Sequence, residues 1–504
     1  MLAICAALVA AGCTAAGTSP GGQADAVIVY GHKGQVPTID PAHADYSQTD
    51  DADRILYDTL VDYNPRGQLV GGLASHFAYT KDVRSISLTL RDDVKFHDGA
   101  ALTARDVKYT LDRNRKIGQG IETMMTSYRS TKVINDHQLS IRLKAPDALF
   151  LGALSRIYIV NSTLVREHAG SDHGQQWLAS NEAGSGPYVL KSLEPSRIEA
   201  LRYDGYWNFR PGRPDRFVEM QVDEPAARRD GLTSGRLSAA DLDVHDLEAA
   251  QNAGLRIYRS TGNGLMSVYF NTSYGITTEP ALRKAISLAF DYRNALDQIE
   301  LGAGRLADGP LPPNLACRPD LPTVRQDRAK AKNLLATAGI KNPELTLRFQ
   351  PAFSDQVQVA TLLQSNLAEI GIKLKLQPIT FPAYLTTLGD WKKIPEMMIA
   401  TESPAYPDPG VMLVQSYDSR AVGTNKTAYK NPAVDQLLHR AATTAEPQRR
   451  CSLYRRAQKI VNDDQAVMPM IHLLGAMGYS KNLIGIAPNA VSNGFDLARL
   501  EVKR

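Results

Sequence analysis

Residues 344–379 read ELTLRFQPAFSDQVQVATLLQSNLAEIGIKLKLQPI. Apolar residues at 345, 347 and 349 alternate with polar ones, which is typical of a half-buried strand. A helix is predicted from Ser354 to Ile370, ended by Gly371, and the alternation resumes at Ile372. Strand, helix and strand in so short a segment form a crossover unit, so the two strands are expected to pair in parallel.

Similar patterns lie upstream of this unit. Asp327 begins a further helix that Gly339 ends. Residues 268–270 predict a short apolar strand, and Pro280 fits the first turn of the helix after it. We interpret this region as the start of a second lobe.

The N-terminal half also mixes strands and helices. Residues 86–90 alternate as a strand, and the turn His97-Asp98-Gly99 follows. Thr103 is expected to cap a helix, with Asp106 as its capping partner. His97 is therefore interpreted as a turn residue and not as a catalytic group.

Length and composition limit the class of protein. The chain has 504 residues, well beyond the roughly 250–300 at which single cores stop growing, so at least two lobes are expected. Hydrophobic residues make up 43%, which suits a folded protein. The net charge of +4 is spread evenly with no dense basic block, so no nucleic-acid partner is predicted.

The N-terminus resembles an export signal. An apolar run over residues 2–9 ends in small residues before Cys13, and it is shorter than the roughly 20 residues of a membrane span. We expect Cys13 to carry lipid, with residues 1–23 as signal and tether, and the protein to be held outside the cytoplasm on the outer face of the cell membrane. The alternative is a fragment of a longer anchor or an apolar start without this role. No Lys or Arg precedes the run, so a start further upstream stays open.

Four cysteines bear on the compartment. Cys5 would leave with the signal and Cys13 would take lipid, so Cys317 and Cys451 remain. In an exported protein this remainder predicts a Cys317–Cys451 disulfide. The alternative is two buried free thiols.

Signals of enzymatic chemistry are missing from the sequence. It has no nucleophile elbow, no phosphate-binding loop and no dinucleotide fingerprint. His168 and His173 are the closest pair among ten scattered histidines, and their spacing puts them on different helix faces. We predict no enzyme activity, no metal site and no cofactor.

One loop is a candidate for ligand recognition. Residues 404–409 read PAYPDP, and three prolines in six residues prevent a helix or a central strand. The stiff loop would present Tyr406 and Asp408 at a small entropic cost. The alternative is a structural turn in which Asp408 bonds its own backbone.

Several segments then carry a resemblance to a known family. In chain order they are Ile39–Ala42, Leu56–Tyr63, Leu88–Gly99, Leu102–Val107, Gly184–Tyr188, Tyr206–Trp207, Tyr269–Thr272 and Ala329–Gly339. Together they resemble the family 5 extracellular solute-binding proteins of ABC importers, which capture oligopeptides, dipeptides and nickel complexes. The resemblance covers nearly everything after residue 25, and residues 88–107 are its most specific part.

The resemblance implies an α/β, two-lobed clamp of the periplasmic-binding-protein type II kind with mixed sheets. Lobe I would comprise residues 24–262 plus 476–504, with an inserted subdomain, and lobe II residues 263–475. Two chain crossings would form the hinge, with the ligand between the lobes. A monomer is expected, whose closure is read by ABC permease and ATPase subunits.

One position departs from the family. Peptide-binding relatives hold the ligand's ammonium with an Asp just before the position of Tyr406, and here that residue is Ala405. A buried ammonium without a carboxylate is costly. Therefore either Glu402 or Asp408 supplies the charge, or the ligand has no free amine there.

The resemblance thus implies Tyr406, Asp408 and Glu402 as ligand contacts, with Asn271 as a fourth. A turn residue that bonds local backbone is the alternative for Asn271. The predicted function is a lipid-anchored binding component of an ABC importer with oligopeptide cargo. The alternatives are a non-peptide cargo such as a metallophore, haem or a sugar-derived solute, a secreted hydrolase, and a binding protein that signals to a sensor.

Overall fold

The structure is a computed structural model, and it describes residues 26–260, 264–489 and 496–503. The predicted signal and tether, with the lipidation site Cys13, lie outside the described residues. None of the described helices has both the length and the apolar character that a membrane span requires.

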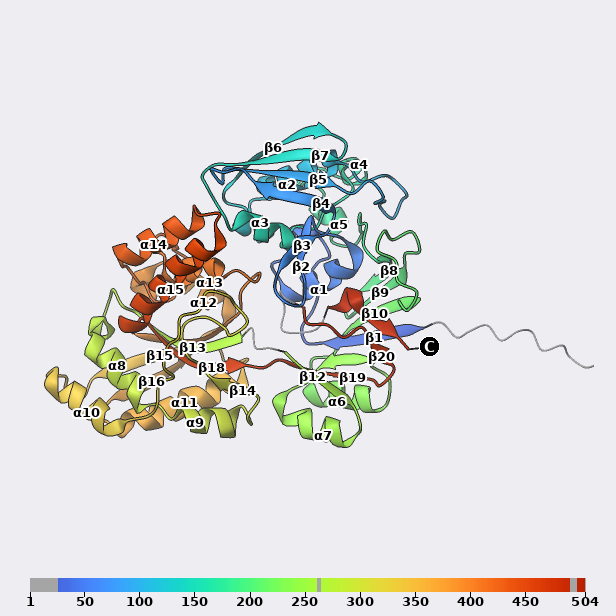
Figure 1. Cartoon of the computed structure of the whole chain (residues 1–504). Coiled ribbons are helices and arrows are strands. Elements are labelled where there is room, and N and C mark those ends of the chain that lie inside the picture. Colours follow the sequence, from blue (N-terminus) through green and yellow to red (C-terminus); the bar gives the residue numbers. More distant parts are fainter. Residues whose placement is uncertain (1–25, 261–263, 490–495, 504) are drawn as a thin grey trace, which may run out of the picture.

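Two bodies are built around separate mixed sheets (Figure 1). The first sheet has the order β12-β19-β11-β1-β10-β9-β8, with strands Arg256–Arg259, Ala476–Tyr479, Ala239–Asp241, Val27–His32, Arg216–Gln221, Arg197–Arg202 and Tyr188–Glu194. The second has the order β14-β18-β13-β17-β15-β16, with strands Gly304–Leu306, Val467–Leu473, Gly264–Phe270, Met397–Glu402, Glu344–Phe349 and Lys373–Pro378. We call the body of the first sheet the first lobe and that of the second sheet the second lobe.

The predicted crossover is confirmed in the second lobe. Strands β15 and β16 pair in parallel, and α11 (Ser354–Ala368) connects them. The helix ends two residues before the predicted Ile370, and Gly371 turns the chain with a φ of +82°. In the first lobe β1 pairs in parallel with both β10 and β11, while β9 and β19 run antiparallel to their neighbours. Both sheets are therefore mixed, as expected.

A four-stranded sheet of order β4-β5-β7-β6 is inserted in the first lobe, with strands Ala74–Tyr79, Ser85–Leu90, Gln138–Leu143 and Tyr128–Asn135. Helix α2 (Ala104–Ile117) packs on β6. Its predicted capping box is confirmed, because the Thr103 hydroxyl accepts from the helix backbone and Asp106 accepts from the Thr103 backbone. One continuous apolar core joins this subdomain to the main sheet of the first lobe.

The longer helices of the first lobe are α1 (Ser47–Leu56), α4 (Ser162–Glu167), α6 (Pro225–Thr233) and α7 (Leu247–Asn252). Those of the second lobe are α8 (Pro280–Ala289), α10 (Arg328–Thr337), α12 (Phe381–Leu388), α13 (Pro409–Tyr417), α14 (Pro432–Ala442) and α15 (Pro447–Asp463). Short hairpins pair β2 (Val61–Tyr63) with β3 (Leu69–Gly71) and β20 (Leu483–Ile484) with β21 (Glu501–Val502). Single-turn helices α3 (Phe150–Ala153), α5 (Gln175–Leu178) and α9 (Tyr292–Asn294) complete the set of α-helices.

The chain passes between the two sheets twice, once between β12 and β13 and once between β18 and β19. These crossings lie side by side, because the Ser260 amide donates to the Gly475 carbonyl and the Gly475 amide donates to the Ser260 hydroxyl at 2.8 Å. The boundary proposed at residue 475 lies next to the second crossing's hydrogen bonds, and the one proposed at residue 262 lies outside the described residues. Paired crossings of this kind form a hinge about which two lobes can close.

A disulfide joins Cys317 to Cys451, with their Cα atoms 4.7 Å apart, so the two are not free thiols. It links the segment before α10 to the first turns of α15, within the second lobe. Cys317 belongs to the apolar core around α13, α14 and α15. The bridge therefore ties a long connection to a buried helix.

Candidate functional site

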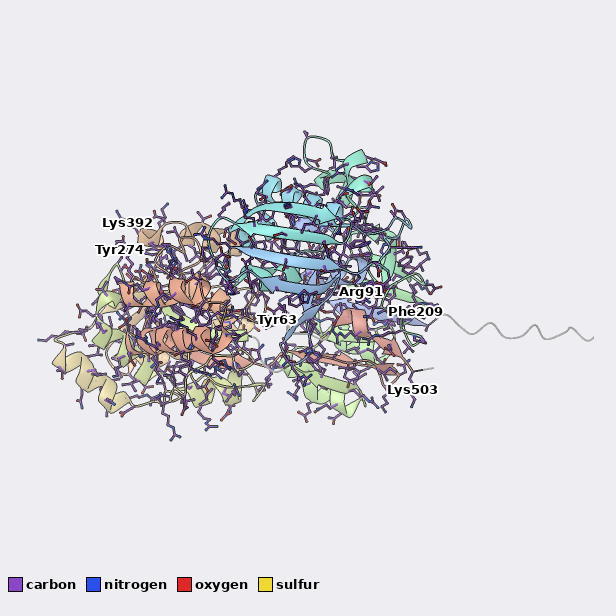
Figure 2. All side chains as sticks on the ribbon, turned by 45° about the horizontal axis from the view of Figure 1, so that its top comes forward. Tyr63, Arg91, Phe209, Tyr274, Lys392 and Lys503 are labelled. Carbon is purple, nitrogen blue, oxygen red and sulfur yellow. A yellow bond between two sulfur atoms is a disulfide. The ribbon has the colours of Figure 1, made fainter. Side chains whose placement is uncertain are left out.

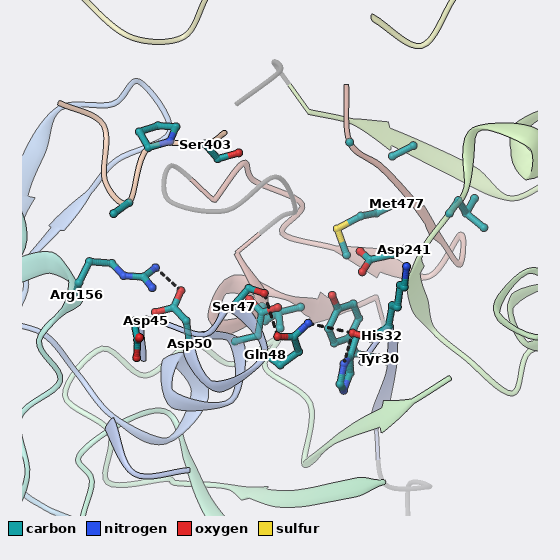
Figure 3. A pocket seen from close by; sticks show the side chains of 18 of the residues that line it. Tyr30, His32, Asp45, Ser47, Gln48, Asp50, Arg156, Asp241, Ser403 and Met477 are labelled. Atoms are coloured by element: carbon teal, nitrogen blue, oxygen red, sulfur yellow. Dashed lines mark hydrogen bonds and ion pairs between the residues drawn. The ribbon is translucent and has the colours of Figure 1, made fainter. Parts of the chain in front are cut away.

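A cavity of about 570 Å³ lies between the lobes (Figure 3). Residues of the first lobe that line it include Tyr30, His32, Lys33, Asp45, Ser47, Gln48, Asp50, Asp51, Arg156, Asp241 and Met477. The second lobe contributes Ser403, Pro404, Ala405 and Gln415, and Gly475 of the second crossing lines it as well. Its volume falls in the range of about 300–1,000 Å³ that is typical of small-molecule sites.

Helix α1 supplies one side of this cavity through Asp50. The Arg156 guanidinium donates to the Asp50 carboxylate at 2.7 Å, and the Tyr158 hydroxyl donates to its other oxygen at 2.7 Å. Arg156 also donates to the Ala44 carbonyl, and Figure 3 shows the guanidinium directed at Asp50. Both partners of the ion pair are buried, so the charges of Asp50 and Arg156 neutralise each other within the first lobe.

The main sheet of the first lobe supplies the opposite side. Tyr30 and His32 on β1 share one face of the sheet with Asp241 on β11, because Tyr30 pairs with Ala239 in parallel register. Met477 on β19 lies opposite Asp241 and extends this face (Figure 3). Burial raises the pKa of Asp241 to about 6, against the opposing effect of the Arg228 charge.

The loop after β17 forms the side of the cavity that belongs to the second lobe. Ser403, Pro404 and Ala405 line it, and none of them carries a charge. Gln415 of α13 lines this cavity and also two smaller ones, of about 410 and 310 Å³. Ala405, where the family resemblance implies an Asp, therefore lines the main cavity.

Tyr406 forms a contact between the lobes. Its hydroxyl donates to the Leu149 carbonyl at 3.1 Å, and its ring packs with Tyr63, Ala153 and Val411 in a small apolar cluster. Figure 2 shows Tyr63 in the space between the two lobes. Gly152 permits the close approach, because an added Cβ would lie 2.7 Å from the Tyr406 ring. Tyr406 lines the cavity of about 410 Å³ and not the main one.

Asp408 is the N-cap of α13, where its carboxylate accepts from the Gly410 amide at 2.8 Å. Arg450 forms an ion pair with it at 3.1 Å. Burial raises the pKa of Asp408, and the Arg450 charge opposes this effect. Asp408 lines none of the cavities described here, so its contacts match the structural turn considered as the alternative.

Glu402 lies at the end of β17 and lines the cavity of about 310 Å³. It forms an ion pair with Lys426, and it accepts from the Tyr269 hydroxyl at 2.7 Å and the Ser416 hydroxyl at 3.2 Å. Its charge is thus already neutralised by a neighbour in the same lobe.

Asn271 is 1% exposed and lines none of the described cavities. Its side-chain oxygen accepts from the Ser273 and Tyr274 amides at 3.1 and 3.0 Å, and its amide donates to the Ile394 carbonyl at 2.8 Å. These bonds hold the turn after β13, which is the role considered as its alternative.

The histidines are placed as the sequence suggested. His97 lies between Glu182 and the Gly186 carbonyl, at 2.8 and 3.0 Å, and so holds the turn before α2. His168 stacks on Trp177 with ring centroids 4.5 Å apart. Within the described part of the chain, no group of three or more His, Cys, Asp or Glu side chains could hold a metal ion.

Sequence reasoning missed most residues of the main cavity, including Tyr30, Asp51 and Asp241. Asp51 follows Asp50 in α1, and adjacent acids near the start of a helix are ordinary in sequences. Asp241 ends a three-residue strand with no polar pattern around it. Asp241 reaches the cavity because β11 pairs with β1 and β19. No local pattern in the sequence predicts these pairings.

Two α/β lobes, two adjacent crossings and a cavity lined from both sides define a type II periplasmic binding protein. The sequence model of the bacterial extracellular solute-binding proteins, family 5 (middle part), matches residues 68–424. The chain belongs to this family, whose members are solute-binding transport proteins and not enzymes.

Relatives and solved structures agree with this assignment. The probable D,D-dipeptide-binding periplasmic protein DdpA of Escherichia coli (strain K12) is 29% identical over 482 residues, covering 92% of each chain. The ABC transporter-associated periplasmic binding protein DppA from Helicobacter pylori, in complex with the peptide STSA, superposes with a TM-score of 0.81 at 22% identity, over 95% of this chain and 98% of that one. NikZ from Campylobacter jejuni, in complex with Ni(L-His), gives 0.80 at 20% identity, over 94% and 99%. At these identities the solved structures show a shared fold.

Proposed function

We propose that this protein is the lipid-anchored binding component of an ABC importer and captures short peptides between its lobes. The cavity of about 570 Å³ carries the proposal, because residues of both lobes line it beside the two crossings. Relatives named as dipeptide, di/tripeptide and glutathione binders support peptide cargo. The anchor would be Cys13, which keeps the lobes near the permease.

Closure couples capture to delivery. A ligand that contacts both lobes binds the closed state more tightly than the open one, and so it shifts the population toward closure. Tyr406 supplies a contact that exists only when the lobes approach, since its hydroxyl bonds the Leu149 carbonyl of the first lobe. A permease would then distinguish loaded from empty protein by shape.

Addition of a tripeptide such as Ala-Ala-Ala is expected to reduce the radius of gyration of the protein in small-angle scattering. The expected response is smaller in Gly152→Val, because the new side chain would collide with the Tyr406 ring, 2.7 Å from an added Cβ. We expect its affinity in calorimetry to fall by about tenfold or more, since a loss of 1.4 kcal/mol of closure energy has that effect. Gly389→Ala is the control for a glycine change away from the lobe contact, because Gly389 is exposed with a φ of −69° and its added Cβ would meet only the Thr386 carbonyl, at 3.5 Å.

Native mass spectrometry of protein purified without refolding would identify retained cargo. A bound mass that corresponds to a metal complex or a haem would replace the peptide assignment. Scattering profiles that stay the same with every peptide, in a protein that binds none of them in calorimetry, would contradict the proposal.

A further inference from the structure

Three carboxylates that line the main cavity form no ion pair among the described residues, although the charges of Arg54 and Arg156 act on Asp51 and that of Arg228 acts on Asp241. Asp45, Asp51 and Asp241 all line it, and within the described ranges no Lys, Arg or His forms an ion pair with any of them. Asp50 differs, because Arg156 neutralises it at 2.7 Å. The first lobe therefore presents carboxyl groups without an ion-pair partner to the space between the lobes.

Asp51 and Asp241 form the inner part of this acidic group. Both are half-buried, whereas Asp45 is exposed. Burial together with the charges of Asp50 and Asp241 raises the pKa of Asp51 well above its ordinary value. Burial and both carboxylates raise the pKa of the Tyr30 phenol, which also donates a hydrogen bond to Asp241. Two carboxylates that line one half-buried cavity favour a cation between them, because the negative charge of Asp241 disfavours ionisation of Asp51.

In the part of the chain that the structure describes, the cations that line the same cavity form no ion pair with Asp51 or Asp241. Arg156 is bound to Asp50 and to the Ala44 carbonyl. The Lys33 ammonium lies 5.6 Å from the centre of the Phe353 ring and forms no ion pair among the described residues. Among the described residues, therefore, no cation forms an ion pair with Asp51 or Asp241, and a cation of the cargo can take that place.

The second lobe adds no free acid to the cavity. Its lining residues there are Ser403, Pro404, Ala405 and Gln415. The two acids nearest in sequence are used elsewhere, Glu402 by Lys426 and Asp408 by Arg450. The negative charge that a cargo meets in this cavity thus comes from the first lobe.

We propose that Asp51 and Asp241 hold an ammonium group of the cargo, on the opposite lobe from the position of Ala405. This inference rests on the proposed function, because it assigns a ligand group to the same cavity. An ammonium fits the pair better than a metal ion does, since a hard divalent cation takes six or more oxygen ligands. No set of three potential metal ligands is present in the part of the chain that the structure describes.

The test is calorimetry at pH 7.5 with Ala-Ala-Ala and its N-acetylated form. Wild type is expected to lose about 30-fold or more in affinity on acetylation, because a buried charge pair loses one partner. The double variant Asp51→Asn plus Asp241→Asn is expected to bind the free peptide about as weakly and to show no effect of acetylation. Both changes keep shape and remove mutual repulsion, so a normal melting temperature is expected. Asp136→Asn, at a surface carboxylate that is 55% exposed, is the matched control.

Two further comparisons show which amine of the cargo is bound and whether Glu402 and Asp408 bind it instead. Acetyl-Ala-Lys-Ala separates an N-terminal ammonium from a side-chain amine, because only the second is present in it. If the effect of acetylation persists in Asp51→Asn plus Asp241→Asn but disappears in Glu402→Gln plus Asp408→Asn, the inference is overturned in favour of the loop. If free and acetylated peptides bind wild type equally, the inference is overturned while the proposed function stands. If neither peptides nor 1,5-diaminopentane bind, both fail.

The pH dependence gives a readout that a structural role would not produce. Asp241 has a pKa of about 6, so it is mostly ionised at pH 7 and mostly protonated at pH 5. A peptide ammonium stays protonated throughout, since its pKa is about 8. Protonation of the carboxylate competes with the cation, so affinity is expected to fall about tenfold from pH 7 to pH 5. Asp51→Asn plus Asp241→Asn removes this fall, and a fall that persists in the double variant would overturn the inference.

Other charged and titratable groups surround Asp51 and Asp241 and influence the pH dependence of the pair. By element they are Tyr30 and His32 of β1, Asp50 and Arg54 of α1, Glu219 of β10, Arg228 of α6, and Arg156. Burial lowers the pKa of His32, which favours its neutral form. Burial raises the pKa of Glu219 well above its ordinary value, which favours its neutral form as well. The carboxylates of Asp51 and Asp241 titrate as a coupled pair within this set.

Discussion

Replacing Cys317 and Cys451 together by serine is expected to lower the free energy of unfolding of the second lobe by up to about 5 kcal/mol. The disulfide closes a loop with a sequence separation of 134, and a cross-link over so long a loop strongly restricts the unfolded chain. The bridge also fixes a buried connection, since the Gln458 side chain donates to the Cys317 carbonyl at 2.8 Å. We expect the variant to unfold at a markedly lower urea concentration.

The measurement is urea unfolding followed by fluorescence, with and without reductant. Reductant should move oxidised wild type toward the double variant and leave the variant unchanged. Cys317→Ala plus Cys451→Ala is the control for packing, because alanine removes the cross-link without adding hydroxyls to a core in which Cys317 is 8% exposed. Coincident transitions for oxidised and reduced wild type would show that the bridge contributes nothing.

The disulfide also has a consequence for the cellular compartment in which the protein is expected. Such bridges persist outside the cytoplasm, where the surroundings are oxidising. The prediction of the bridge rested on assigning Cys5 and Cys13 to an export signal; the pairing of Cys317 with Cys451 is confirmed, whereas the signal stays a prediction. The relatives that are named as periplasmic proteins are also located outside the cytoplasm.

The parts of the fold that could be predicted are those that short-range patterns determine. The parallel pair β15 and β16 followed from alternation and from the length of the helix between them. The capping box at Thr103 followed from the spacing of two residues. Lobe membership needed the family resemblance, because no local pattern shows that β19 joins the sheet that β1 begins.

The candidate site was harder to predict, because its residues meet through long-range strand pairing. The stiff loop around Tyr406 was found from its prolines, and it does lie between the lobes. However, a proline-rich loop does not show which side chain faces the ligand and which one packs. Asp408 caps α13, as acids before a helix commonly do. The charge in the main cavity comes instead from Asp51 and Asp241, whose positions depend on α1 and on the pairing of β11 with β1.

Replacing Asp40 by alanine is expected to cost about 3–5 kcal/mol of stability, because it leaves a buried charge without a partner. Arg113 of α2 donates to both Asp40 oxygens, at 2.9 and 2.6 Å, and the two side chains are 2% and 1% exposed. Asp40 also accepts from the Ala42 amide at 3.0 Å, so it fixes the turn in which it lies. The pair joins the segment after β1 to the inserted subdomain, which explains an acid in the family-like segment Ile39–Ala42.

Urea unfolding of three variants tests this account. Asp136→Ala removes the partner of Arg105 in an ion pair of similar length, 2.9 Å, but the side chains there are 66% and 55% exposed, so a loss of no more than about 1 kcal/mol is expected. Asp40→Ala combined with Arg113→Met removes both charges and is expected to recover a large part of the loss, because the penalty comes from the unpaired guanidinium. Equal losses in Asp40→Ala and Asp136→Ala would show that burial does not set the strength of this pair. Failure of the second substitution to recover stability would assign the loss to the turn at Ala42 instead.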